Sequence, residues 1–215
     1  MLLYSILGTF TTCIPLFFGF RYYKKISGEM KILVWYLVSS FVFETIVNLL
    51  VLLSLSHNTL WISHVFPIIE YIFLVVIFSW WQKNIFLKKA YLWSILFMAA
   101  FTIVNLLFFQ SVIQANTYAM SMHKLLLIGI SAFALLELNK EGIYPLTREY
   151  RFWVATGVLF YNLTTLMLFS LANLVISYGR QFAEPIFMMN IALNVIMYLI
   201  YTKGFLCRPQ GQKSG

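Results

Sequence analysis

Positive charge alternates with hydrophobic runs along this chain, and this alternation constrains the fold more than any other feature. The sequence contains seven hydrophobic runs, and all but two of its 15 Lys and Arg residues lie in or beside every second gap between them, or after the last run. Loops rich in Lys and Arg stay on the cytoplasmic side when a membrane protein inserts. The pattern therefore predicts seven transmembrane helices, with the N-terminus outside and the C-terminus in the cytoplasm. The four basic segments contain Arg21, Lys24, Lys25 and Lys31; Lys83, Lys88 and Lys89; Lys140, Arg148 and Arg151; and Lys203, Arg208 and Lys213.

Two cations do not follow this pattern. The alternate gaps, around residues 56–59, 111–117 and 178–184, hold only Arg180, and Lys124 lies inside a hydrophobic run. The composition agrees with a membrane protein, because 61% of the residues are hydrophobic and only 10% are charged, whereas charged residues make up about 25% of an ordinary soluble domain.

We expect an all-α polytopic membrane protein, in which one bundle of seven helices occupies residues 1–205 and a short cytoplasmic tail occupies residues 206–215. A helix needs about 20 apolar residues to cross the hydrocarbon core of a bilayer, so the spans leave no room for a separate extramembrane domain. The plasma or inner membrane is the expected location, with the lipid bilayer as the first partner. The expected spans lie near residues 3–20, 32–55, 60–80, 91–110, 118–138, 152–177 and 186–202.

The net charge of +8 does not indicate a nucleic-acid partner. The cations flank the hydrophobic runs, where they fix orientation and meet anionic lipid headgroups. A nucleic-acid-binding protein would instead carry a continuous basic face. We expect no binding of nucleic acid.

Several ionisable and amide side chains fall inside the expected spans. Ionisable groups at bilayer depth are costly and tend to be functional. Glu44 and Glu70 lie near the middle of their spans, whereas His64, His123 and Lys124 lie in the outer third. Asparagines follow the same outward bias, so we expect a polar cavity nearer the outer face than the inner face.

Helical spacing groups some of these residues. Glu44 and Asn48 are four residues apart, and so are Asn190, Asn194 and Tyr198, so each set lies on one face of a helix. The alternative for the asparagines is that they act as hydrogen-bonding contacts between helices, contributing roughly 0.6 kcal/mol each.

His64 and Glu70 are six residues apart in the third span, with Pro67 between them. On a straight helix their side chains point about 120° apart, and a kink at Pro67 either brings them together or leaves them on separate contacts. For His64, His123 and Lys124, the alternative is that the polar end of the side chain reaches the membrane surface.

Our leading functional hypothesis is an integral membrane protein that binds or translocates a small polar or cationic ligand, or protons. Glu44 and Glu70 would carry the charge. No catalytic residue set and no metal-binding motif are found in the sequence, which contains no Asp, and no cofactor is identified. The residues expected to line the route to the glutamates are Asn48, His64, His123, Asn190 and Asn194.

Two alternatives stay open at this point. The first is a receptor or membrane subunit that acts through a separate protein partner, because the spans leave no room for an output domain. The second is an intramembrane lipid hydrolase that uses His64, His123 and the glutamates. The sequence favours a protein that is not an enzyme.

Overall fold

The structure, a computed structural model, describes residues 2–53, 60–142 and 145–207, and their side chains except those of residues 2–5 and 180. This part of the chain is almost entirely helical and contains no strand. Within it, six helices are long and apolar enough to cross a membrane. They are α3 (Gly28–Leu52), α4 (Ile62–Trp81), α5 (Ile85–Phe108), α6 (Thr117–Lys140), α7 (Tyr150–Ser170) and α9 (Arg180–Leu206).

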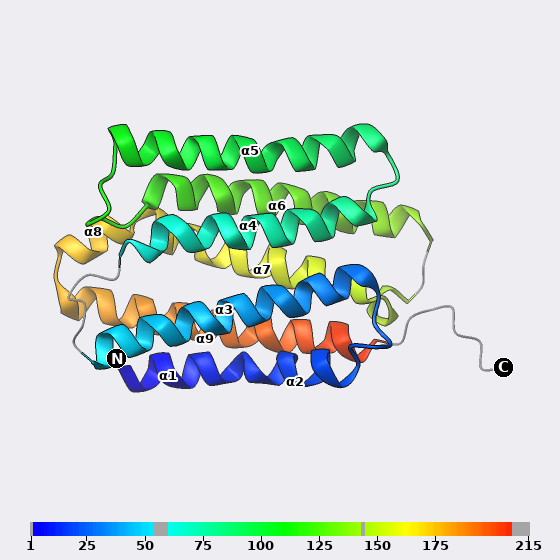
Figure 1. The fold of residues 1–215 in the computed structure, drawn as a ribbon, viewed down its shortest axis with the longest axis horizontal. Helices are drawn as coiled ribbons and strands as arrows, with labels where there is room; N and C mark the ends of the chain where they lie inside the picture. Colours follow the sequence, from blue (N-terminus) through cyan, green and yellow to red (C-terminus); the bar gives the residue numbers. More distant parts are fainter. Residues whose placement is uncertain (1, 54–59, 143–144, 208–215) are drawn as a thin grey trace.

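The first expected span forms two shorter helices, α1 (Leu2–Thr11) and α2 (Cys13–Arg21), which lie end to end in Figure 1. The break falls at Thr12, whose N–H bonds to the carbonyl of Thr9, only three residues back. Pro15 supplies the physical reason, because it has no N–H to donate to the carbonyl of Thr11.

The sixth expected span is also divided. It forms α7 and a short helix, α8 (Ala172–Ser177), on either side of Leu171. Gly179 then reverses the chain into α9 with a φ of +100°, a backbone conformation that glycine adopts without the clash of a Cβ atom. The connection between α6 and α7 contains a single 3₁₀ turn, η1 (Leu146–Arg148).

The long helices lie side by side along the molecule, with α5 at one edge and the α1–α2 pair at the other (Figure 1). The α2–α3, α4–α5 and α6–α7 connections and the end of α9 gather at one end of the bundle. We call this the basic end, because it brings together the described part of all four basic segments. The expected gap at 56–59 and the tail from residue 208 lie outside the described residues.

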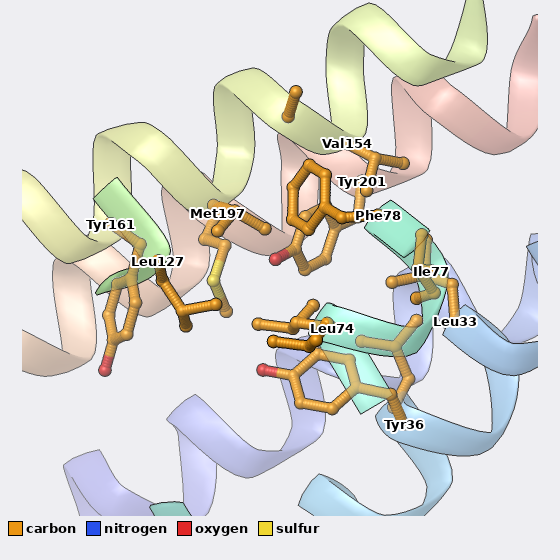
Figure 2. Close-up of a cluster of buried hydrophobic side chains, with 14 of the residues drawn as sticks. Leu33, Tyr36, Leu74, Ile77, Phe78, Leu127, Val154, Tyr161, Met197 and Tyr201 are labelled. Carbon is orange, nitrogen blue, oxygen red and sulfur yellow. The ribbon is translucent and has the colours of Figure 1, made fainter. Parts of the chain in front are cut away.

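A densely packed apolar core joins the central helices. Figure 2 shows this cluster, in which side chains from α3, α4, α6, α7 and α9 meet. Helices α7 and α9 approach so closely that a Cβ atom on Gly157 would lie 2.7 Å from Cε1 of Tyr201, and small residues permit such approaches between transmembrane helices. The buried members include Leu33, Tyr36, Leu74, Phe78, Leu127, Val154, Met197 and Tyr201.

An ion-pair cluster connects three segments at the basic end. The Glu141 carboxylate lies 2.8 Å from Nζ of Lys83 and 2.9 Å from Nη2 of Arg151, and Arg151 also bonds to Glu149. The hydrogen bond from Lys83 lowers the pKa of Glu141. These contacts hold the end of α6 against the α4–α5 connection and the start of α7.

Candidate functional site

A cavity of about 370 Å³ lies between α1, α3, α4, α6, α7 and α9. Leu60 and Ile62 form part of its wall, and α4 begins at the end of the bundle opposite the basic end (Figure 1). Its volume is within the range of pockets that hold small ligands. The polar residues of the lining are Thr9, Ser63, Glu44, Glu70, His123, Lys124, Tyr161, Asn190 and Asn194.

Glu44 is held by neutral hydroxyl groups. The Tyr198 hydroxyl donates a hydrogen bond to Oε1 of Glu44 at 3.0 Å, and Thr9 of α1 also hydrogen-bonds to this carboxyl group. Asn48 is not part of the cavity lining. Its Nδ2 donates to Oγ1 of Thr9 at 3.0 Å, so Asn48 supports Glu44 through Thr9.

Glu70 has a different set of neighbours. It is only 8% exposed, and its Oε1 accepts a hydrogen bond from the Tyr36 hydroxyl at 2.9 Å. Its other oxygen lies 3.8 Å from Nε2 of His123, and that nitrogen has no hydrogen-bond partner among the described residues. Lys124 attracts the same carboxylate through space.

Lys124 is the unexpected member of the site, since the charge pattern left it unplaced. Its side chain is buried, and Nζ donates to Oγ1 of Thr165 at 2.8 Å. The same nitrogen lies 4.6 Å from the ring centre of Tyr161 and 4.5 Å from that of Phe169. Cation–π contacts of this kind stabilise an ammonium group that has left water.

Asn190 and Asn194 bring the α9 face into the site, as their spacing predicts. The Tyr161 hydroxyl donates to Oδ1 of Asn190 at 3.2 Å, and Asn194 also hydrogen-bonds to Tyr161. Tyr161 belongs both to the cavity wall and to the apolar core, so the core adjoins the cavity directly.

His64 lies on the other side of its helix from the cavity contacts. It is buried, and Nε2 lies 3.2 Å from the carbonyl oxygen of Gln114 in the α5–α6 connection. It does not line the cavity. The proline between them therefore leaves His64 and Glu70 on separate contacts.

A second polar cluster fastens the α5–α6 connection. Nδ2 of Asn105 donates to Oε1 of Gln110 at 3.1 Å and to Oδ1 of Asn116 at 2.6 Å. Gln110 in turn donates to Thr117, and Asn173 of α8 bonds to both backbone groups of Ala115. We call Asn105, Gln110, Asn116, Thr117 and Asn173 the loop clamp.

The sequence predicted one group of polar residues in the outer half of the bundle, and the structure places them at more than one location, including the cavity and the loop clamp. Five of the seven predicted site residues line the cavity, namely Glu44, Glu70, His123, Asn190 and Asn194. Sequence reasoning missed Lys124, Tyr161 and Thr9 as members of the site. The available signal was Lys124 itself, since a lysine inside a span is costly without partners.

The cavity offers groups that bind small molecules, with two carboxyl groups, one ammonium group and several amides and hydroxyls around a partly aromatic space. In the described part of the chain, no three or more His, Cys, Asp or Glu side chains are grouped so that they could hold a metal ion. Comparison of the chain with protein families, with curated proteins and with solved structures gives no match.

Proposed function

We propose that this protein binds or translocates a small cationic or polar ligand, or protons, within the membrane, and that Glu44 and Glu70 carry the charge of the site. The observation that carries this proposal is that the two carboxyl groups, from α3 and α4, lie on the wall of one cavity. Acidic side chains within transmembrane bundles commonly mark substrate or proton pathways.

The remaining lining supports a cation rather than an anion. The cavity contains two acidic side chains but one lysine, and the aromatic rings of Phe66, Tyr161 and Phe187 are also part of its wall. Aromatic faces attract organic ammonium groups. The amides of Asn190 and Asn194 would bind polar groups on the ligand.

The proposal includes a membrane arrangement. Helices α1 and α2, of 10 and 9 residues, together have about the 30 Å length of a bilayer core at 1.5 Å per residue, and we propose that they form a seventh crossing. The basic end would then face the cytoplasm of a plasma or inner membrane, with the N-terminus outside. Reporter groups fused to the two termini test this arrangement, and finding both on one side of the membrane would reject it.

Binding can be measured with four probes that share a four-carbon chain. Purified protein in detergent would be titrated calorimetrically with n-butylammonium, butyrate, 4-aminobutyrate and n-butanol. We expect n-butylammonium to bind, butyrate not to bind, and Glu44→Gln to weaken the n-butylammonium affinity by at least about tenfold, or 1.4 kcal/mol. Failure of every probe to bind, or tighter binding of butyrate, would contradict the proposal.

A matched control is available at the basic end. Glu137 accepts a hydrogen bond from Nε2 of Gln82 at 2.7 Å and does not line the cavity. The amide oxygen introduced by Glu137→Gln can accept the same bond. We therefore expect this variant to keep the n-butylammonium affinity within about twofold, as for sites that do not interact.

A second candidate function is a receptor or membrane subunit that acts through a separate protein. The observation in its favour is the gathering of the basic segments at one end of the bundle (Figure 1), which offers a surface for an acidic partner. Purification in mild detergent tests it. A stoichiometric partner that dissociates at high salt supports this role, and a protein that purifies alone from its native membrane counts against it.

A further inference from the structure

The two glutamates of the cavity are not equivalent in charge. Glu70 has the ammonium group of Lys124 acting on it and His123 at 3.8 Å. The hydrogen-bond partners of Glu44 are the hydroxyls of Tyr198 and Thr9. Among the described residues, no ion pair involves Glu44. One carboxyl group of the cavity is thus compensated by the protein and the other is not.

The compensating lysine is a fixed part of the cavity wall. Lys124 is only 2% exposed, and its ammonium group is held by the Thr165 hydroxyl and by two aromatic rings. It makes no direct ion pair with Glu70 within 4 Å, so the attraction acts through space. Since a buried charge needs an opposite charge nearby, removing Glu70 would leave the lysine without its counter-charge.

An uncompensated carboxylate inside the membrane is equally costly. This cost is avoided in only two ways. Either Glu44 takes up a proton and is neutral, or a cation that enters the cavity balances its negative charge. On the basis of the proposed function, we infer that Glu44 exchanges one proton for one monovalent organic cation, while Glu70 and Lys124 remain a fixed internal pair.

The exchange balances as follows. The O–H bond of protonated Glu44 breaks and the proton passes to water. The carboxylate then accepts a charge-assisted hydrogen bond from the ammonium group of the ligand. No electron is transferred, and the net charge of the cavity is the same before and after. Binding of the cation and binding of the proton are therefore mutually exclusive.

The wall next to Glu44 indicates an organic ammonium ion rather than a metal ion. Val47 lies three residues along α3 on the same helical face, and Gly8 and Ile191 pack against each other in the same wall. These apolar groups suit a short hydrocarbon chain attached to the charged group. The ligand class is thus a small organic ammonium ion with an N–H group to donate and an apolar body.

The titratable groups around the two carboxyls decide how the exchange is measured. Tyr198 and Tyr161 are the titratable groups that act on Glu44, and free phenols titrate only near pH 10. Tyr36, His123 and Lys124 face Glu70. Proton release near neutral pH must therefore come either from Glu44 or from the cluster of Glu70, His123 and Lys124. A variant at position 44 separates these two sources.

The first experiment measures protons directly in the wild-type protein. Calorimetric titration with n-butylammonium at pH 7, repeated in buffers with different ionisation enthalpies, gives the number of protons released per cation bound. We expect about one proton, and an affinity that rises about tenfold for each pH unit while Glu44 is protonated in the empty site. Binding without proton release would overturn the exchange but leave the proposed function intact, whereas no binding at all would overturn the proposed function.

Two variants complete the test. Glu44→Gln should remove proton release, and its persistence in this variant would assign the proton to another group and overturn the inference. Glu70→Gln should weaken n-butylammonium binding by at least about thirtyfold, because Lys124 then lacks its counter-charge. The double variant Glu70→Gln/Lys124→Met removes both charges, so it should bind n-butylammonium clearly more tightly than Glu70→Gln alone and still release one proton. A double variant as weak as Glu70→Gln would contradict the fixed pair.

Discussion

The cavity and the loop clamp are two polar clusters in the half of the bundle away from the basic end, and they are built from different chemistry. In the clamp, neutral amides and hydroxyls bond to one another, as when Asn105 donates to both Gln110 and Asn116. In the cavity, the ionisable groups of Glu44, Glu70, His123 and Lys124 surround an open space. The first arrangement fixes a loop, and the second leaves a charge to be balanced.

The difference follows from what each kind of group needs inside a membrane. An amide is satisfied once its hydrogen bonds are made, and another amide can make them. A charge also needs an opposite charge or a proton. A cluster of amides therefore needs no charge from outside. The cavity has two carboxyl groups and one ammonium group, so one carboxyl group is left to be balanced by a proton or a bound cation.

The largest expected effect tests the charge side of this comparison. Glu70→Gln should lower the free energy of unfolding by about 3 kcal/mol, the lower end for breaking a buried charge pair, because the buried ammonium group of Lys124 loses its counter-charge. Chemical unfolding in mixed micelles measures the loss. Most of it should be recovered in the double variant with Lys124→Met, and an unchanged stability in the single variant would show that Glu70 does not compensate Lys124.

The next effect tests the amide side. Asn105→Ala removes both donated bonds of a side chain that is 2% exposed, and it should cost about 2 kcal/mol because the acceptors are left buried. The n-butylammonium affinity should stay within about twofold, since the clamp does not line the cavity.

Asn162→Ala is the matched control for this substitution. Asn162 is as buried as Asn105, but within the described part of the chain its Nδ2 donates only to the carbonyl of Val158 in its own helix. Losing this local bond should cost about 1 kcal/mol. Equal losses of unfolding free energy in the two variants would show that the bonds from Asn105 to Gln110 and Asn116 stabilise the protein no more than one local bond within a helix.

The smallest effect concerns charges outside the membrane core, at the basic end. The hydrogen bond from Lys83 lowers the pKa of Glu141 below its ordinary value of 4.5. The stabilisation is therefore complete above that ordinary value and is lost as the pH falls through the lower folded-state pKa. Because Lys83 is 82% exposed, the loss should be below about 1 kcal/mol.

Unfolding of wild type and Glu141→Gln at a series of pH values from 7 downward measures this contribution. The two proteins should differ at pH 7, and the difference should shrink as the pH falls below 4.5 through the lower folded-state pKa of Glu141. A difference that is the same at every pH would show that the Glu141 contacts do not depend on its charge.

Much of the helical framework could be predicted from the sequence, because hydrophobic run length and charge alternation are properties of the chain itself. The expected spans over 32–55, 60–80, 91–110 and 118–138 each correspond to one long helix. Pro15 indicated a kink in the first span, but the division of that span into two helices at Thr12 and the break at Leu171 were not predicted. Such breaks depend on local backbone hydrogen bonds and on packing against neighbouring helices, which hydrophobicity does not report.

The candidate site could be predicted only in part. Helical spacing correctly placed Asn190 and Asn194 on one face, because that spacing is set by the helix. It could not show that Asn48 would bond to Thr9, or that His64 would turn to Gln114. Those outcomes depend on how the helices are rotated about their axes.

Helix α5 lies at the edge of the bundle, and no residue of the cavity lining comes from it. Its outward side chains, among them Trp93 and Phe97, are more than half exposed. In the proposed membrane arrangement these side chains face lipid, so this helix is the place for a spectroscopic label that lies against the bilayer. A fluorophore there would report on the assembled bundle while the cavity and its charges stay untouched.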